Sequence, residues 1–310
     1  MDAAVDAATR RAALVDAARA LDDAADVGAT LLLRGDALYP AALLDLSDPP
    51  PHLFALGDPR VADAPAVAIV GTRRATAYGE RTAHEIATAL ARAGVAVISG
   101  LARGIDAVAH RAALDAGGRT VAVLGTGVDV AYPAAHAALH ARIAGQGLVL
   151  SEHAPGERAG AGAFPRRNRI IAALASTTIV IEAGFKSGAL ITASHALDLG
   201  RTVAAVPGPI DAPQSAGANE LLRDGAAVIA SPADALALLG VSAPRAQRVP
   251  LADRPPDERA VLEALTSGAL DIDSLAARAR LPAVRCLAAV TALELSGAVD
   301  CALTGEIRRL

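Results

Sequence analysis

The stretch VAIVGTRRATAYGERTAHEIATALARAGVAVISG, residues 67–100, decides the fold. It opens with the apolar, β-branched run VAIVG (67–71) and closes with a second such run, VAVISG (95–100). Between them, the pattern of apolar and polar residues predicts a helix at 79–93. Short apolar strands separated by a helix are typical of parallel strands that are covered on both faces. This stretch therefore predicts one strand–helix–strand unit of a parallel sheet.

The same alternation continues for another 140 residues or so. Further strands are predicted at 120–125, 147–152, 177–183, 202–208 and 226–230. Helices are predicted between and after them at 105–116, 134–144, 167–175, 188–199, 216–223 and 232–239. We therefore predict an α/β fold with a doubly wound, mostly parallel sheet and helices on both faces. In such sheets, ligands bind beyond the carboxyl ends of the strands, where the strand order reverses.

The flanking segments predict smaller units around this domain, which we place at 64–240. Residues 1–63 form a helical and extended lead-in with a Pro-rich middle. Residues 241–256 are a linker by composition, and 257–310 contain three helical patterns followed by a hairpin pattern in AVDCALTGEIRRL (298–310). Three helices and a hairpin in so short a segment match a winged helix.

Composition and charge narrow the classes of function. The net charge is −4 and Lys186 is the only lysine, so any site for a polyanion must be local and built from arginine. No apolar run is long enough to span a membrane, and the first residues carry Asp and Arg throughout, unlike a signal peptide. These features predict a soluble, cytoplasmic protein.

The sequence offers little support for a disulfide or a metal centre. Cys286 and Cys301 could pair, but without an export signal they are expected to be free thiols. His136 and His140 are spaced to share a helix face, but no third ligand lies nearby. We predict no metal and no cofactor.

Cationic and Gly-containing loops follow several predicted strands. Backbone N–H groups at helix N-termini are unpaired and lie at the positive end of the helix dipole, which favours an anion there. The residues concerned lie after the first, second and fifth predicted strands and in FPRRNRIIAALAS (164–176): Gly71, Thr72, Arg73, Arg74, Gly100, Arg103, Gly104, Lys186, Ser187, Gly188, Phe164, Arg166, Arg167, Asn168 and Arg169. Because these loops share one edge of a parallel sheet, we predict that they converge on an anion site.

Catalytic groups are poorly supported by comparison. The chain has neither a GxGxxG fingerprint after the first strand nor a GxxxxGK[ST] phosphate loop. Ser99 lacks the G-x-S-x-G setting of a nucleophile. Glu182 could be a general base, but holding arginines of the cluster in place is the better-supported role, and His110 and His195 could each face the site or simply pack between helices. We predict a protein that is not an enzyme.

Taken in order, several of these segments resemble the DprA (Smf) family of DNA-processing proteins. The resemblance rests on GTRRATAYG (71–79), SGLARGIDAVAH (99–110), FPRRNRIIAALAS and EAGFKSGALITASHALDLGRTVAAVPGPI (182–210). It extends to GANELLRDGA (217–226) and to the lead-in LYPAALLDLSDPPPHLFALGD (38–58). It implies a Rossmann-like domain that binds single-stranded DNA without sequence preference and forms a homodimer. It further implies that the protein protects the strand and loads the recombinase RecA during natural transformation (competence) and DNA recombination.

The resemblance also implies roles for individual residues. The DNA-binding set matched to the family is Arg73, Ser99, Gly100, Arg103, Arg167, Asn168, Arg169, Lys186, Ser187 and Gly188. The positions expected to order the site are Asp106, His110, Glu182 and Thr192. Phe164 and Phe185 lie in candidate loops and could stack on bases, or could cap the core beneath those loops.

Two other functions remain open from the sequence alone. The first is a nucleotide phosphoribohydrolase of the lysine-decarboxylase-like (LOG) group, but its PGGxGTxxE block is replaced here by IEAGFKSGALITA (181–193). The second is a regulator whose winged helix reads duplex DNA, yet its candidate recognition helix offers only Arg285 as a cation, which favours a protein-binding role. The stretch 226–240 is a candidate dimer surface or simply part of the core.

Overall fold

The computed structural model describes residues 18–241, 251, 254–295, 298–301 and 305–309. The chain divides into two units, residues 1–243 and 244–310, each with a hydrophobic core of its own. The linker predicted at 241–256 falls largely outside the described residues.

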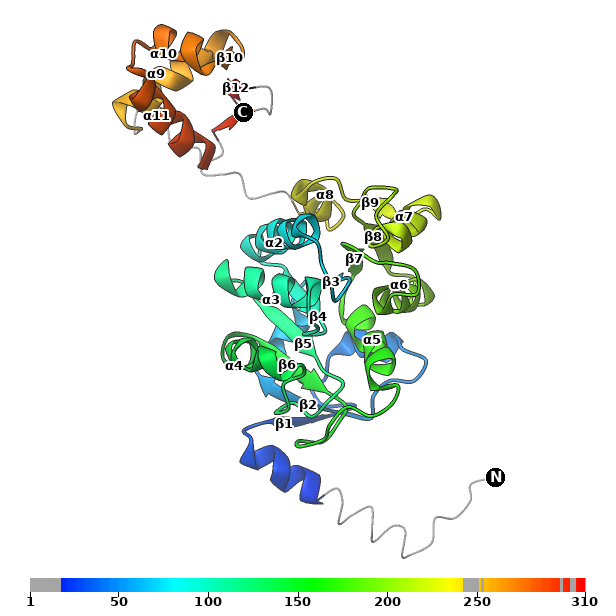
Figure 1. Ribbon diagram of the computed structural model, residues 1–310. Coiled ribbons are helices and arrows are strands. Elements are labelled where there is room, and N and C mark those ends of the chain that lie inside the picture. Colours follow the sequence, from blue (N-terminus) through cyan, green and yellow to red (C-terminus); the bar gives the residue numbers. More distant parts are fainter. Residues whose placement is uncertain (1–17, 242–250, 252–253, 296–297, 302–304, 310) are drawn as a thin grey trace, which may run out of the picture. The chain divides into compact units, whose positions relative to one another are not determined.

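The first unit is built on a nine-stranded sheet of order β1-β2-β6-β5-β4-β3-β7-β8-β9 (Figure 1). All pairings from β6 to β9 are parallel, and β1 and β2 are antiparallel additions at the β6 edge. The strands are β1 (Thr30–Leu33), β2 (His52–Gly57), β3 (Ala66–Val70), β4 (Ala96–Ser99), β5 (Thr120–Val123), β6 (Leu148–Ser151), β7 (Thr177–Val180), β8 (Thr202–Ala205) and β9 (Ala227–Val228). The predicted mostly parallel, doubly wound sheet is confirmed.

Helices cover both faces of this sheet. Figure 1 shows α2 (Ala77–Arg92), α3 (Ile105–Asp115) and α4 (Ala137–Gln146) on one side and α5 (Ala163–Leu174) and α6 (Gly188–Asp198) on the other. The unit also contains helical residues at 18–26, α7 (Ala216–Arg223), α8 (Pro232–Ala237) and the short 3-10 turns η1 (Ala41–Asp45), η2 (Pro59–Asp63) and η3 (Ala134–His136).

The central strands are apolar throughout because both of their faces are covered. Every residue of β3 through β7 is buried. Ile86 and Leu90 of α2 pack on one face, and Ile170 and Ile171 of α5 pack on the other. This burial explains why the strands appear in the sequence as continuous rather than alternating apolar runs.

The described part of the predicted lead-in, residues 18–63, contributes two strands to the main sheet. Instead of forming a separate extended segment, residues 30–33 and 52–57 extend the main sheet as β1 and β2. Leu53 and Phe54 of β2 are buried, and the hydroxyl of Tyr39 donates to the carbonyl of Pro50 at 2.7 Å. Three consecutive prolines before β2 hide the strand signal, since proline usually marks a turn or edge.

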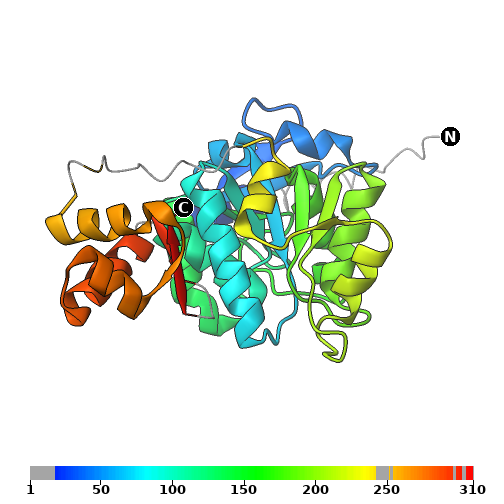
Figure 2. The same ribbon diagram turned by 90° about the horizontal axis from the view of Figure 1, so that it is seen from above.

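The second unit contains three helices and a small sheet (Figure 2). Its elements are α9 (Pro256–Ala264), η5 (Leu265–Ser267), β10 (Leu270–Asp271), α10 (Ile272–Ala279), α11 (Ala283–Leu295), β11 (Val299–Cys301) and β12 (Glu306–Arg309). The predicted hairpin is confirmed as β11 paired with β12, and β10 adds a third strand. Its core includes Leu275, Leu293 and Ile307.

The described residues bear on disulfide formation, metal binding and membrane spans. Cys286 and Cys301 are not joined by a disulfide, as the sequence predicts, and burial raises the pKa of the Cys286 thiol. In the described part of the chain, no cluster of three or more potential metal ligands occurs. Among the same residues, no helix is long and apolar enough to cross a membrane.

Candidate functional site

Two adjoining cavities open at the carboxyl edge of the parallel strands. Their volumes are about 240 and 260 Å³, and both are lined by Arg73, Phe164 and Arg167. One reaches toward Ser187 and Gly188 after β7, and the other toward Arg103 after β4. The pair lies where β4 and β7 flank β3, which is the reversal of strand order predicted to bind a ligand. We call these two cavities the arginine pocket.

The loop after β3 is held in place by the neighbouring loops. The Thr72 amide donates to the Glu182 carbonyl at 2.7 Å, and the Ile105 amide donates to the Thr72 carbonyl at 3.3 Å. Gly104 has a φ of +74° and lies directly against Thr72, so a Cβ there would collide with the Thr72 carbonyl. A glycine is required by this close approach. The result is a fixed base from which Arg73 extends into the pocket.

Arg167 is the buried cation of the pocket, with only 6 % of its surface exposed. Its Nη1 donates to the Gly100 carbonyl at 2.9 Å, and its guanidinium lies so close to Gly100 that a Cβ there would clash. No carboxylate of the described residues lies within ion-pair distance of it. Burial lowers the pKa of Arg167 to about 10, so the group stays charged at neutral pH.

Asp106 supplies the long-range counter-charge to Arg167. Its Oδ2 accepts from the amides of Gly100 at 3.1 Å and Ala102 at 3.4 Å, which fixes the loop between β4 and α3. Burial raises the pKa of Asp106, and the positive charge of Arg167 opposes that rise. Asp106 therefore orders the site by holding the backbone amides of the loop after β4.

An aromatic pair forms one wall of the pocket. The rings of Tyr132 and Phe164 lie 5.0 Å apart at an angle of 33°, and the Arg73 guanidinium carbon lies 5.5 Å from the Phe164 ring centre. Tyr132 is 47 % exposed and Phe164 is half-buried, so Phe164 lines the pocket and does not cap the core. Phe185, by contrast, is 72 % exposed and lies outside both cavities.

His110 supports the loop after β4 from behind. Its Nε2 accepts from the Leu101 amide at 3.3 Å, and its Nδ1 contacts Thr120 Oγ1 at 2.7 Å, whose hydroxyl donates to the Val97 carbonyl. This arrangement requires a neutral ring with its proton on Nδ1. Complete burial, together with the nearby charge of Arg167, lowers the pKa of His110 to about 3, which keeps the ring neutral.

Glu182 has a different partner from the one expected. Its Oε2 accepts from the Thr76 amide at 3.0 Å and its Oε1 from the Thr76 hydroxyl at 2.5 Å, and it lies against Gly79. The carboxylate therefore stabilises the N-terminus of α2 and does not hold an arginine of the cluster. Because both oxygens are engaged and the residue is buried, it is also poorly placed to act as a general base.

The remaining predicted residues divide into those that line the pocket and those behind or beside it. Lining residues that were predicted from sequence are Gly71, Arg73, Arg74, Gly100, Arg103, Asp106, Phe164, Arg167, Asn168, Ser187, Gly188 and Thr192. Asn168 is oriented by donating to the Gly188 carbonyl at 3.1 Å. Ser99 is fully buried and donates to the Ile69 carbonyl at 2.7 Å, so it supports the sheet edge. Lys186 is exposed and does not line either cavity.

The arginines of the RRNR segment do not all converge. Helix α5 begins at Ala163, four residues earlier than predicted, so these residues lie within its first two turns. Successive helical residues are rotated by about 100°, which separates Arg167 and Arg169 by about 200°. Arg169 accordingly pairs with Glu152 at 2.6 Å, and Arg166 lines a different cavity. The expectation that Arg169 joins Arg73, Arg103 and Arg167 is wrong.

Sequence reasoning missed Tyr132 and Pro133, which line the pocket. They follow β5, in a loop that begins with GTGVDV (125–130) and contains no arginine or lysine to mark it as an anion site. The usable signal was position: this loop also leaves the carboxyl edge of the sheet, and it contains one of only three tyrosines in the chain.

The arrangement favours binding of an anion with a flat, apolar group attached. Guanidinium groups form forked hydrogen bonds to phosphate and also stack on planar rings. Arg73 and Arg103 are exposed, and among the described residues neither has a carboxylate partner. The aromatic wall beside them suits a nucleobase.

The fold is a Rossmann-like α/β domain with a separate unit of winged-helix type, and comparison with known proteins identifies its family. The profile described as DNA recombination-mediator protein A matches residues 30–240, and the DprA winged helix domain profile matches residues 244–302. The chain belongs to the DNA recombination-mediator protein A (DprA/Smf) family.

Individual relatives agree with this assignment. A putative DNA processing protein DprA of Mycobacterium tuberculosis is 46% identical over 257 residues, which cover 80% of this chain and 66% of the relative. The X-ray structure of DprA from Streptococcus pneumoniae matches with a TM-score of 0.65 at 42% identity, covering 67% of this chain and 73% of that one.

A second solved structure bears on the ligand. It is DprA from Helicobacter pylori, described in terms of its unique single-stranded DNA binding mode, with a TM-score of 0.63 at 32% identity. It covers 69% of this chain and 97% of that one. The present chain spans just under two thirds of the mycobacterial relative and 56% of the Synechocystis protein Smf.

Proposed function

We propose that the arginine pocket binds single-stranded DNA without sequence preference. The observation that carries the proposal is the stack of Arg73, Phe164 and Tyr132 beside Arg167, a buried guanidinium with no carboxylate at ion-pair distance among the described residues. Phosphates would bind the guanidinium groups and a base would stack on the aromatic wall. The single-stranded DNA binding ascribed to the Helicobacter pylori relative supports this reading.

The salt dependence of binding tests the proposal. If Arg73, Arg74, Arg103 and Arg167 each neutralise one phosphate, log K should fall with log[salt] at a slope near −3, from about −0.7 per phosphate. Fluorescence anisotropy with a labelled oligonucleotide measures this slope, and Arg73→Ala should reduce its magnitude by about 0.7. Arg92→Ala removes an exposed arginine at the end of α2 and is the matched control. A flat salt response, or an Arg73→Ala variant with unchanged slope, would rule the proposal out.

On this proposal the protein acts in the cytoplasm, where it protects single strands and loads RecA onto them during natural transformation and recombination. Support comes from family membership and from a pocket that can hold a strand by its phosphates while bases beyond it stay free. A mobility-shift assay with RecA tests it. Wild type should increase the RecA-bound fraction of the strand, and Arg73→Glu should not. RecA loading that is unaffected by Arg73→Glu contradicts this role for the pocket.

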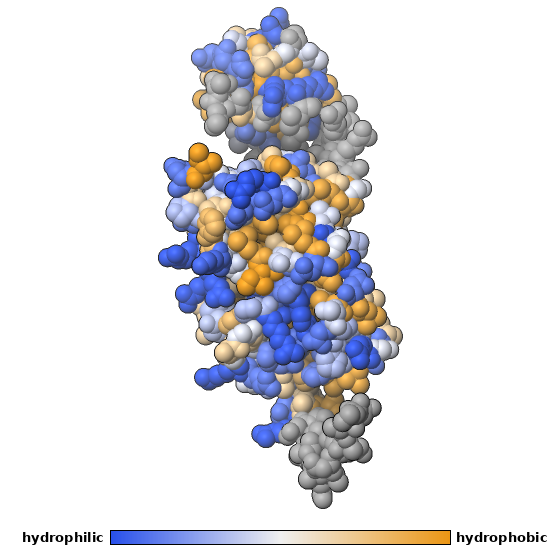
Figure 3. Space-filling view, turned by 90° about the vertical axis from the view of Figure 1, so that its right-hand side faces the viewer, coloured by the Kyte–Doolittle hydropathy of each residue, from blue (hydrophilic) through white to orange (hydrophobic). Residues whose placement is uncertain are grey.

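We further propose that the protein acts as a homodimer. Figure 3 shows apolar side chains gathered on the face of the first unit that carries α6 and α7. Three large apolar side chains are exposed: Leu197 of α6 (59 %), Ile210 of the loop after β8 (99 %) and Val228 of the edge strand β9 (57 %). Within the candidate stretch 226–240, Ile229, Ala235 and Leu236 pack into the core, so Val228 is its most exposed large apolar residue. Light scattering should give a dimer for wild type and a monomer for Val228→Glu; a wild-type monomer contradicts the proposal.

A further inference from the structure

A third cavity lies beside the arginine pocket and is lined by residues at the start of α5. Its volume is about 210 Å³, below the range of about 300–1,000 Å³ typical of sites for whole small-molecule ligands. Arg167 lines both this cavity and the arginine pocket, so the two sites are neighbours. The full lining is Pro51, His52, Leu124, Glu152, His153, Ala163, Arg166 and Arg167. Its size suits one flat ring.

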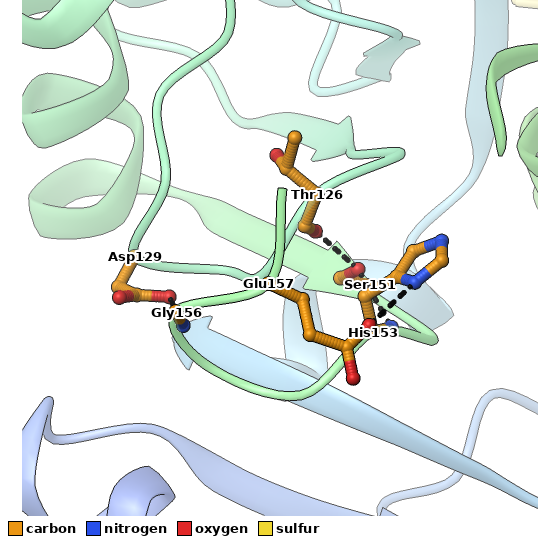
Figure 4. Close-up of polar contacts among 6 residues, drawn as sticks. All are labelled: Thr126, Asp129, Ser151, His153, Gly156 and Glu157. Atoms are coloured by element: carbon orange, nitrogen blue, oxygen red, sulfur yellow. Dashed lines mark hydrogen bonds and ion pairs between the residues drawn. The ribbon is translucent and has the colours of Figure 1, made fainter. Parts of the chain in front are cut away.

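The loops around this cavity are fixed by a network of hydrogen bonds. Figure 4 shows Ser151 donating to the Thr126 carbonyl at 2.6 Å and Glu157 contacting the His153 ring at 2.9 Å. The Gly156 amide donates to Asp129 at 2.8 Å, which ties the loop after β6 to the loop after β5. The cavity is therefore preorganised before any ligand binds, and the same bonds steady the loop that carries Tyr132.

Glu152 gives the cavity one hydrogen-bond acceptor of fixed position. Its side chain is 16 % exposed, and Oε1 accepts from Arg169 Nη2 at 2.6 Å. Oε2 has no partner among the described residues. Tyr39 lies near this ion pair, since the charges of Arg169 and Glu152 both act on its pKa. Arg169 thus neutralises the carboxylate through Oε1, and Oε2 is left to accept a hydrogen bond from a ligand in the cavity that Glu152 lines.

Arg166 gives the same cavity a cation at its rim. It is exposed and, among the described residues, is not part of an ion pair. The apolar floor of Pro51, Leu124 and Ala163 suits the faces of a ring rather than a phosphate. A strand bound at Arg167 could therefore place its next nucleotide here, with the phosphate at Arg166 and the base on the apolar floor.

We propose that this cavity is a base-accepting subsite, in which a nucleobase with an exocyclic amino group donates to Glu152 Oε2 while Arg166 binds the adjoining phosphate. The proposal rests on the proposed function, since the same strand would occupy the arginine pocket. A carboxylate accepts from the amino group of cytosine, whereas the corresponding position of thymine is a carbonyl that a carboxylate repels. The arginine pocket would still bind any strand, and this cavity would add a preference for cytosine over thymine at one position.

Competition between homopolymers on the full chain tests this subsite. Oligo(dC) and oligo(dT) of about 20 nucleotides exceed the site sizes of about 4–16 nucleotides known for single modules. At mildly alkaline pH, wild type should bind oligo(dC) about fivefold or more tightly, the lower end of discrimination by one base contact. Glu152→Gln should bring the ratio close to one, because a glutamine amide can also donate to the thymine carbonyl. Glu85→Gln, an exposed glutamate of α2, is the matched control and should keep the wild-type ratio.

Glu152→Gln removes the ion pair with Arg169 and could unfold the protein. A second variant, which leaves this ion pair intact, tests the subsite independently. Arg166→Ala should weaken oligo(dC) more than oligo(dT), since only the cytosine strand occupies the cavity. An equal loss for both strands, or a wild-type ratio near one, would overturn the subsite while leaving the proposed function intact. Absence of binding to either strand by wild type would overturn both.

Discussion

Two regions of this molecule contain several arginines and use them differently. At the carboxyl edge of the main sheet, Arg73, Arg103 and Arg167 have no carboxylate at ion-pair distance among the described residues. In the C-terminal unit, Arg254 pairs with Glu258 at 3.0 Å and Arg285 pairs with Asp257 at 2.5 Å. The same residue type thus lines an open pocket in one region and forms intramolecular ion pairs in the other.

The difference shows that net charge is a poor guide to anion binding in this chain. A total of −4 would argue against a nucleic-acid partner if charge were spread evenly. What matters is whether guanidinium groups converge without a carboxylate to neutralise them. The edge loops meet that condition because parallel strands bring loops from distant parts of the sequence together.

Reversing the charge of two arginines at the carboxyl edge should have the largest effect on single-stranded DNA binding. The double variant Arg73→Glu/Arg103→Glu should lower single-stranded DNA affinity by about 100-fold or more, since each lost charge-assisted hydrogen bond contributes about 1.5 kcal/mol or more. Fluorescence anisotropy at fixed salt measures the loss. The matched control, Arg92→Glu/Arg111→Glu, reverses two exposed arginines of α2 and α3. If both double variants lose affinity equally, overall charge and not the pocket governs binding.

His110 tests what holds the loop after β4 in place at the carboxyl edge of the sheet. Its folded-state pKa of about 3 lies below the ordinary value of 6.5, so between these values the unfolded chain binds a proton that the folded chain does not. The free energy of unfolding should therefore be unaffected by this group above pH 6.5 and fall by about 1.4 kcal/mol per pH unit below it, down to about pH 3.

Urea unfolding of His110→Gln as a function of pH measures this contribution. The variant is neutral at every pH, so its curve should lack that part of the acid slope. His84→Gln replaces an exposed histidine of α2 and should retain the wild-type slope. An unchanged slope in His110→Gln would mean that the loop after β4 is not held by a neutral His110.

Phe164 tests how much a single aromatic ring of the arginine pocket contributes to DNA binding. Phe164→Leu keeps an apolar side chain but removes the aromatic face beside Arg73, and affinity should fall by about 1–3 kcal/mol, or about 5- to 150-fold. Phe164→Tyr keeps the ring and should bind within a few-fold of wild type. Titration with a labelled oligonucleotide separates the two. Equal losses in both variants would show that the ring packs the loop and does not stack on a base.

Much of the fold was accessible from the sequence because its signals are local. The buried strands are continuous apolar runs, and the order of strands and helices leaves few topologies open. The exceptions are β1 and β2, whose pairing with β6 depends on long-range contacts and whose neighbourhood is rich in proline. The location of the arginine pocket at the carboxyl edge followed from the parallel sheet alone.

The site was accessible only in part, because the direction of a side chain depends on where a helix begins. Placing the start of α5 at 167 instead of Ala163 left no basis for separating Arg167 from Arg169. The partners of Glu182 and the contact between Tyr132 and Phe164 join residues far apart in the sequence, which no local pattern encodes. The family resemblance supplied Arg167 but also Arg169, since a motif records residues and not their orientation.

Arg285 gives the smallest expected effect and tests the other half of the comparison. It is the cation nearest the start of α11, but Asp257 holds it in a bidentate ion pair, with bonds of 2.8 and 2.5 Å. The exposed side chains beside it are apolar: Val284 is 81 % exposed and Leu287 is 56 % exposed. A helix that reads duplex DNA presents cations and polar groups to the groove. Arg285→Ala should therefore change duplex affinity by no more than a few-fold, measured by anisotropy with the full chain. A large loss confined to duplex DNA would mean that Arg285 leaves Asp257 to bind phosphate, and that both regions of the molecule contribute cations to nucleic acid.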